Sequence, residues 1–138
     1  MDYDKETLVA ELIRDEGVEL KPYRCTAGKL TIGVGRNLDD RGITRDEASY
    51  LLKNDIAICE KDLDRVVPNW RNLSDARQRV LINMAFNLGI ARFSGFQKFI
   101  ANIRLGDFKA AAREMMDSAW AKQVGQRAAR LRDMMERG

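Results

Sequence analysis

The stretch Glu16–Gly35, EGVELKPYRCTAGKLTIGVG, contains the change of pattern that decides the fold. The helical spacing of apolar residues stops where it begins, and glycines become frequent. It holds two short β-prone segments, Tyr23–Cys25 and Leu30–Val34, and Ile43 follows soon afterwards. We therefore expect short strands and turns over residues 18–43.

A helix is expected before this stretch, from Asp2 or Asp4 to Gly17, a residue type that favours helix ends. Four apolar side chains share one of its faces: Leu8, Val9, Leu12 and Ile13. They span about 140° of the helical wheel, and Glu16 falls inside this stripe. Burial raises the pKa of a carboxyl, and a protonated carboxyl is what a glycosidase needs to protonate a leaving sugar oxygen. The alternative is a solvated glutamate at a helix end.

After the strands, Thr44 and Glu47 have the spacing of a capping box. A helix should follow over residues 45–66 and stop before Pro68. Its expected length, about 30 Å, is enough to join two lobes.

The rest of the chain has helical patterns throughout. Predicted helices start at Ser74, at a second capping box Ser94–Gln97, at Asp107 and at about Gln126, and glycines 89 and 106 end the first two. We expect a single-domain α+β fold. A small N-terminal lobe with a short β-sheet (about 1–45) is joined by the long helix to a helical C-terminal lobe (about 67–138), with a cleft between the lobes.

The composition is that of a globular protein, with 45% hydrophobic and 33% charged residues. No apolar run approaches the roughly 18 residues of a membrane helix, and the acidic N-terminal segment is not typical of a secretory signal. We therefore expect synthesis in a cytoplasm and no stable membrane insertion.

The chain has no histidine, and its cysteines are Cys25 and Cys59. The absence of histidine excludes Ser–His triads, histidine zinc sites and histidine general bases. Acid–base chemistry must then use carboxylates, cysteine, lysine or tyrosine. Two cysteines so far apart, in a chain without a secretory signal, are expected to be free thiols.

Charge is unevenly distributed along the chain. Residues 1–66 carry 11 Lys and Arg against 15 Asp and Glu, whereas residues 67–138 carry 13 against 6. The basic half should attract an anionic partner, such as nucleic acid, a membrane surface or an acidic cell-wall polymer.

Arg127 lies beside Met134 at the edge of the apolar stripe of the last predicted helix. An arginine partly inside an apolar face usually needs an anion. Glu16 is a candidate for that anion, and an ordinary basic face is the alternative.

Residues 28–36, GKLTIGVGR, contain a G-x-G pair. The third glycine and the following helix of a nucleotide-binding fingerprint are missing, so a phosphate-binding loop is not expected. The glycines are better explained as tight turns beside a substrate.

Several of these segments resemble the phage-type lysozymes, the endolysins of glycoside hydrolase family twenty-four. The most specific part is the spacing Glu16–x8–Cys25–x5–Thr31, followed by Ile32-Gly-x-Gly35. The resemblance continues, in the family's order, through ITRDEA (43–48), LINMAFNLG (81–89), FSGF (93–96), SAW (118–120) and RAAR (127–130). It covers nearly the whole chain.

The resemblance implies a lysozyme-like fold with the active site between the lobes. It implies that Glu16 is the general acid and that Thr31 helps to position the attacking water. It places Asn83, Asn87 and Arg127 in the cleft, with Arg127 in the position that pairs with the catalytic glutamate. The implied substrate is the β-1,4 bond between N-acetylmuramic acid and N-acetylglucosamine in bacterial peptidoglycan. No cofactor and no metal are implied.

Cys25 departs from the family pattern, because most members have the catalytic Asp there. A thiol with an ordinary pKa is only a few per cent ionised at pH 7. Lys21, Arg24 or Arg36 nearby could depress that pKa. As a thiolate, Cys25 could be a base, a charge stabiliser or a nucleophile that forms a covalent glycosyl-enzyme.

Two other interpretations of this departure stay open. The enzyme could depend mainly on Glu16 and Thr31, or the substitution could have inactivated the protein. Asp39 and Asp40 are reserve carboxylates, but their expected loop position favours plain solvation.

A muramidase that lyses bacteria is thus the leading hypothesis, and two others remain. A lytic transglycosylase needs one acid/base carboxyl and no water-activating Asp. A non-catalytic wall- or nucleic-acid-binding module would use only the basic half. Nucleic acid is not the expected partner, because the arginine-rich segments lack base-stacking aromatics. For an endolysin we expect a monomer, held in the host cytoplasm until a separate membrane-permeabilising protein releases it to the cell wall.

Overall fold

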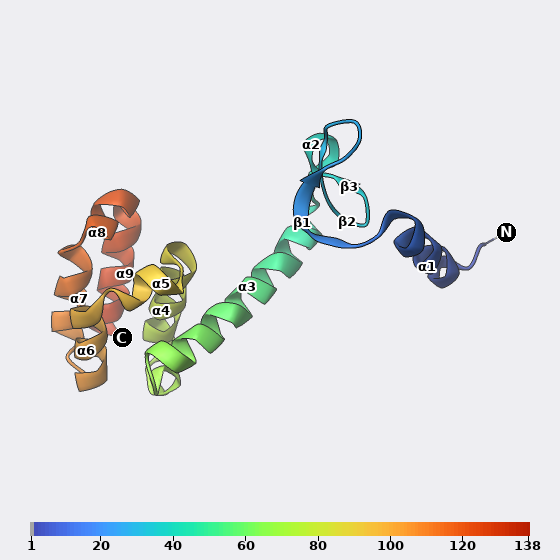
Figure 1. Cartoon of the computed structure of the whole chain (residues 1–138). Helices are drawn as coiled ribbons and strands as arrows, with labels where there is room; N and C mark the ends of the chain where they lie inside the picture. Colours follow the sequence, from blue (N-terminus) through green and yellow to red (C-terminus); the bar gives the residue numbers. More distant parts are fainter. Residues whose placement is uncertain (1) are drawn as a thin grey trace. The chain divides into compact units, whose positions relative to one another are not determined.

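The computed structural model describes residues 2–138 and divides into two compact units (Figure 1). The N-terminal unit extends to Tyr50, and the helical unit is Leu51–Gly138. A small antiparallel sheet in the first and helices throughout the second confirm the predicted α+β fold class. Among the described helices, none combines the length and the apolar character needed to cross a membrane.

Helix α1 spans Lys5–Glu16, as predicted. Asp4 caps its first turn by accepting a hydrogen bond of 3.2 Å from the Thr7 N–H. Gly17 ends it at a φ of +75°, where a side chain would cause strain. No residue of α1 is buried, so the apolar side chains of its stripe are exposed.

Three antiparallel strands follow in the order β1-β2-β3. They are β1 (Glu19–Arg24), β2 (Leu30–Gly33) and β3 (Arg36–Asn37). Tyr23 of β1 lies opposite Thr31 of β2, and Thr31 lies opposite Asn37 of β3. The central strand therefore holds Thr31 between two neighbours.

The strand predictions need correction at three positions. Cys25 and Val34 lie just outside their strands, because turns begin there. Ile43 is not in a strand. A short helix that was not predicted, α2 (Leu38–Arg41), precedes it, and Asn37 caps α2 by accepting from the Asp40 N–H at 3.0 Å.

Helix α3 spans Arg45–Val66 and begins with the predicted capping box. The Thr44 hydroxyl accepts from the Glu47 N–H at 3.1 Å, and the Glu47 carboxylate accepts from the Thr44 N–H at 2.8 Å. Arg36 also donates two hydrogen bonds to the Glu47 carboxylate, at 2.8 and 2.7 Å, and these bonds connect β3 to the start of α3.

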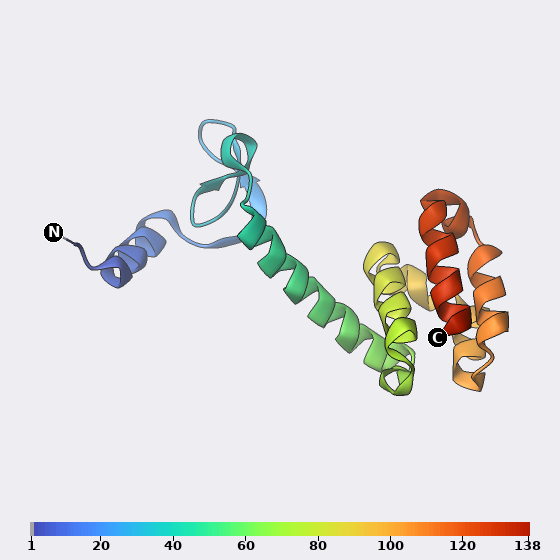
Figure 2. The same ribbon diagram turned by 180° about the vertical axis from the view of Figure 1, so that it is seen from behind.

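The helical unit continues from α3 with a 3-10 turn and six helices around one core. They are η1 (Trp70–Asn72), α4 (Asp75–Leu88), α5 (Ile90–Ser94), α6 (Gln97–Leu105), α7 (Phe108–Met116), α8 (Ala119–Val124) and α9 (Gln126–Arg137). Helix α7 packs against α6 and α9, and α4 and α8 also contact α9 (Figure 2). The largest fully buried side chains, among them Trp70, Phe93 and Met135, all belong to this unit.

The capping box predicted at Ser94–Gln97 is wrong. Ser94 is instead the last residue of α5, where its hydroxyl donates back to the Ile90 carbonyl at 2.7 Å. Helix α6 starts after Phe96, whose side chain cannot cap it.

The helix predicted from Asp107 to about Ser118 is confirmed as α7, but a further short helix, α8, follows it. Helix α7 ends at Met116, and Ser118 then accepts from the Ala121 N–H at 3.2 Å to start α8. The sequence prediction had no separate helix here.

Candidate active site

Glu16 ends α1, and its carboxylate lies against the turn between β2 and β3. A Cβ atom placed on Gly35 of that turn would be 3.2 Å from Glu16 Oε2. The side chain is otherwise exposed, so the burial expected for Glu16 from the apolar stripe of α1 is not found within the N-terminal unit. The carboxylate is therefore positioned by backbone on one side and open to a ligand elsewhere.

Cys25 closes the hairpin between β1 and β2. Its N–H donates to the Lys29 carbonyl at 2.9 Å, and its own carbonyl accepts from the Gly28 N–H at 2.8 Å. Around the thiol lie the backbone N–H groups of Lys29 and Ala27, which act on it most, and the Thr31 hydroxyl. These polar neighbours lower the pKa of Cys25 from its ordinary 9.0, although desolvation opposes them. A larger fraction of Cys25 is thus thiolate at neutral pH.

The cause of this lowered pKa differs from the one that the sequence suggested. Arg24 Nη1 donates to the Gly28 carbonyl at 3.2 Å and lies 3.4 Å from Asp39. Arg36 is paired with Glu47. Backbone N–H groups, rather than these cations, act on the thiol of Cys25.

Thr31 is buried, with 3% of its surface exposed, and it reaches Cys25 from the central strand. Its hydroxyl donates to the Lys29 carbonyl at 2.8 Å. A hydroxyl has one proton, so the same group can serve either this carbonyl or the thiolate. The structure therefore brings Cys25 and Thr31 together at the turn end of one hairpin.

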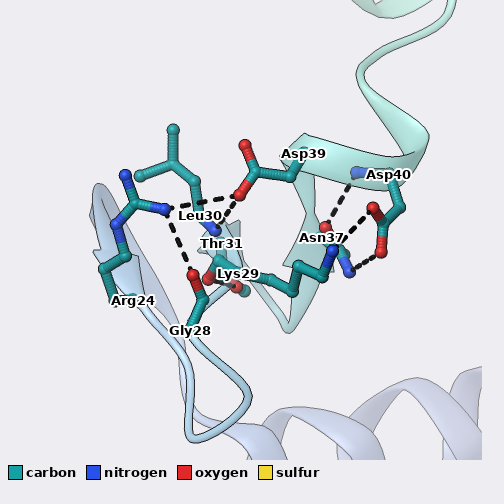
Figure 3. A network of polar contacts seen from close by, with 8 residues as sticks. All are labelled: Arg24, Gly28, Lys29, Leu30, Thr31, Asn37, Asp39 and Asp40. Atoms are coloured by element: carbon teal, nitrogen blue, oxygen red, sulfur yellow. Dashed lines mark hydrogen bonds and ion pairs between the residues drawn. The ribbon is translucent and has the colours of Figure 1, made fainter.

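Asp39 and Asp40 brace this hairpin from α2 (Figure 3). Asp39 accepts from the Leu30 N–H at 2.7 Å, and Asp40 lies 3.2 Å from Lys29 Nζ. The expected plain solvation in a loop is wrong, because both carboxylates hold specific partners from the first turn of a helix. Their role here is structural.

In the helical unit, Asn83 of α4 and Arg127 of α9 form a pair. The Asn83 Oδ1 accepts from Arg127 Nε at 3.0 Å and from Nη2 at 2.7 Å. This fork leaves Arg127 Nη1 and the Asn83 amide N–H₂ available. Within Leu51–Gly138 no carboxylate pairs with Arg127, so its charge is uncompensated there.

Asn87 lies one turn beyond Asn83 on α4, and its side chain is held by Trp120 of α8. The buried indole N–H donates to Asn87 Oδ1 at 2.8 Å. The amide N–H₂ of Asn87 thereby points away from Trp120. Two neighbouring amides on α4 thus have fixed oxygens and free donors.

Asn83 and Arg127 also line a groove of about 640 Å³ between α3, α4 and α9. Its wall is largely apolar, with Leu52, Phe86 and Met134 among the lining residues. The prediction that Arg127 lies beside Met134 at the edge of an apolar stripe is confirmed.

The predicted site residues thus form two groups, one in each unit. Glu16, Cys25 and Thr31 belong to the N-terminal unit, and Asn83, Asn87 and Arg127 belong to the helical unit. The pairing of Glu16 with Arg127 stays a prediction, because the two residues are in different units.

No sequence pattern indicated a role for Trp120, and Gly35 was expected only to form a tight turn beside a substrate. The indole bond to Asn87 joins residues 33 positions apart, so no local pattern could signal it. Among residues 2–138, no group of three or more Cys, Asp or Glu side chains is arranged to hold a metal ion.

Comparison with known proteins supports the resemblance. The profile of the Phage lysozyme family matches residues 14–137. The chain is 33% identical to the endolysin of Acyrthosiphon pisum secondary endosymbiont phage 1, over 83% of this chain and 78% of that protein. It is 27% identical to the probable T4-type lysozyme 1 of Dictyostelium discoideum, over 90% of each chain.

A third relative is the pre-baseplate central spike protein Gp5 of Enterobacteria phage T4. It is 30% identical over 89% of this chain, which spans only 26% of the length of Gp5. The match of the family profile extends over nearly the whole chain. The chain therefore belongs to the phage lysozyme family and is a glycoside hydrolase that acts on peptidoglycan.

Proposed function

We propose that the enzyme hydrolyses the β-1,4 bond between N-acetylmuramic acid and N-acetylglucosamine, with Glu16 as general acid. The protonated carboxyl gives its proton to the bridging oxygen while the bond to the anomeric carbon breaks. Water adds to that carbon and loses a proton to a base. The contact of Glu16 with the β2–β3 turn supports this role, because a proton donor must be held in place.

Cys25 is the proposed base, acting as a thiolate. The observation that carries this proposal is the placement of Cys25 beside Thr31, because the Cys25 N–H and the Thr31 hydroxyl both donate to the Lys29 carbonyl, at 2.9 and 2.8 Å, and the neighbouring N–H groups lower the pKa of the thiol. N–H and O–H dipoles near the sulfur stabilise its negative charge and raise the thiolate fraction. Thr31 then supports the base, and through it the attacking water.

Asn83, Asn87 and Arg127 are the proposed substrate-binding residues of the helical unit. The oxygens of both amides are already bonded, so their N–H₂ groups can donate to the acetamido carbonyls or hydroxyls of a glycan. Arg127 adds a cationic donor for a carboxylate.

The test is digestion of purified peptidoglycan, with mass analysis of the products. We expect reducing ends from the parent and a loss of at least about 100-fold in rate for Glu16→Gln, which keeps the shape but lacks the acid. A parent rate from Glu16→Gln would exclude Glu16 as the acid. Anhydro-sugars would identify a lytic transglycosylase, and binding without products would identify a non-catalytic wall-binding protein.

Host lysis is the proposed biological role, by analogy with the endolysin relatives. In this proposal the enzyme acts as a monomer and as one lysozyme domain. A separate membrane-permeabilising protein releases it from the host cytoplasm to the wall. Expression in bacteria should then cause lysis only when the inner membrane is also permeabilised, and lysis without permeabilisation would contradict this route.

A further inference from the structure

Two features of the structure favour a glycine at position 35, and only one of them is the backbone conformation. Its φ is +65°, and a Cβ atom there would lie 3.2 Å from Oε2, 3.5 Å from Cδ and 3.7 Å from Cγ of Glu16. Gly33, at the other end of the same turn, has a φ of +70°, and a Cβ on it would meet nothing within 4 Å. The two glycines therefore share a backbone requirement but differ in their contact with the carboxylate.

We infer that Gly35 is a positioning residue for Glu16, because the carboxylate occupies the space that its missing side chain leaves. The inference deepens the proposed function and rests on Glu16 being the acid. Contact with the turn backbone limits how far the carboxyl end of Glu16 can swing toward the sheet. A proton donor benefits directly from this limit, because it must stay within hydrogen-bonding reach of one substrate oxygen.

A side chain at position 35 would displace the carboxylate rather than unfold the turn. A contact of 3.2 Å is tight, and the atom that must yield is the end of a flexible side chain. If the Glu16 carboxylate moves by a few tenths of an ångström, its close contact with the new Cβ is relieved. Since misplacement by about 1 Å can reduce a rate by about 100-fold, we expect roughly a 10-fold loss for this smaller movement.

The experiment compares Gly35→Ala with Gly33→Ala, which has nearly the same φ but no contact with Glu16. Both variants should lose a similar amount of thermal stability. Only Gly35→Ala should lower kcat on soluble peptidoglycan fragments, by about 10-fold with KM unchanged. Equal kcat values for the two variants would overturn the inference, and so would a change in KM without a change in kcat.

Two additions keep the outcome clear. The pair Gly35→Asn and Gly33→Asn replaces the alanine pair if the latter does not fold, because asparagine tolerates positive φ better. Crystal structures of the variants should show the Glu16 carboxylate displaced in the position-35 variant only, and an undisplaced carboxylate would refute the inference. The position of the carboxylate can be observed without any activity. It therefore tests the positioning role separately from the proposed reaction. An inactive parent or a fully active Glu16→Gln would instead reject the proposed reaction.

Discussion

At the scale of single residues, Cys25 is the base of the proposed mechanism and would act in the second half of the reaction. We expect Cys25→Asp to be active and Cys25→Ala to lose most of the activity, because only the former supplies an anion. The pKa of Cys25 is lowered from 9.0, so activity of the parent should rise with pH as the thiolate forms. An aspartate ionises near pH 4, so the same rise should occur at much lower pH in Cys25→Asp.

The measurement is the pH dependence of kcat on purified peptidoglycan for the parent and both variants. Cys25→Ser serves as a control of similar shape, since a hydroxyl does not ionise in this range. If Cys25→Ala kept the parent rate, the enzyme would operate mainly with Glu16 and Thr31.

The Trp120–Asn87 bond gives a second prediction for single residues. Trp120→Phe keeps an aromatic ring but removes the donor to Asn87 Oδ1, so the amide loses its fixed orientation. We expect KM to rise several-fold and stability to fall by more than the roughly 1 kcal/mol of the lost hydrogen bond, because the smaller ring also leaves a cavity. Trp70→Phe is the matched control, because the Trp70 indole also donates one bond of 2.8 Å, to Asp64. A similar KM for both variants would argue against Asn87 as a ligand of the glycan.

At the scale of elements, the junction of β3 and α3 depends on Glu47. Hydrogen bonds from Arg36, and then from the Thr44 N–H, lower the pKa of Glu47 from 4.5 to about 2. A carboxyl with a lowered folded-state pKa stabilises the fold above its unfolded value, and this contribution is lost as the pH falls. We therefore expect thermal stability to decline between about pH 4.5 and pH 2.

The variants Glu47→Gln and Arg36→Gln should both flatten this decline, because each removes the interaction that shifts the pKa. Thermal unfolding followed by circular dichroism between pH 2 and 7 measures the effect. An unchanged acid-induced decline in both variants would show that other carboxyls cause it.

The sequence predicted those elements whose start depends on nearby residues. Thr44, Ser74 and Asp4 each cap a helix within three residues, and all three helix starts agree with the structure. Ser94 has the same capping-box spacing but is the last residue of a helix, and its hydroxyl donates to the Ile90 carbonyl instead of capping the next helix. A local pattern cannot distinguish these two outcomes.

The residues of the candidate site could be predicted from the sequence, but most of their contacts could not. The family spacing singled out Glu16, Cys25 and Thr31, but the closeness of Cys25 to Thr31 results from the hairpin register. The N–H groups that act on the thiol belong to Lys29 and Ala27, whose side chains carry no signal for this role. Backbone donors and distant bonds, such as that from Trp120, are set by the tertiary fold.

At the scale of the whole molecule, the uneven charge should govern how the enzyme reaches its substrate. Residues 67–138 carry 13 Lys and Arg against 6 Asp and Glu, and peptidoglycan presents carboxylates on its peptides. Attraction of this kind is screened by salt, since the Debye length falls from about 30 Å at 0.01 M to about 8 Å at 0.15 M. We expect the rate on intact walls to fall severalfold over this range, whereas the rate on short fragments, which carry few carboxylates, should change much less.

The matched variant replaces three exposed lysines of the helical unit, Lys98, Lys109 and Lys122, by glutamine. None of them lines the groove that holds Asn83 and Arg127, so the chemistry should be unchanged. The variant should resemble the parent on short fragments and show a weaker salt dependence on walls. If parent and variant responded equally to salt on walls, the charge of the helical half would not be guiding the enzyme, and contacts within the site would have to account for binding.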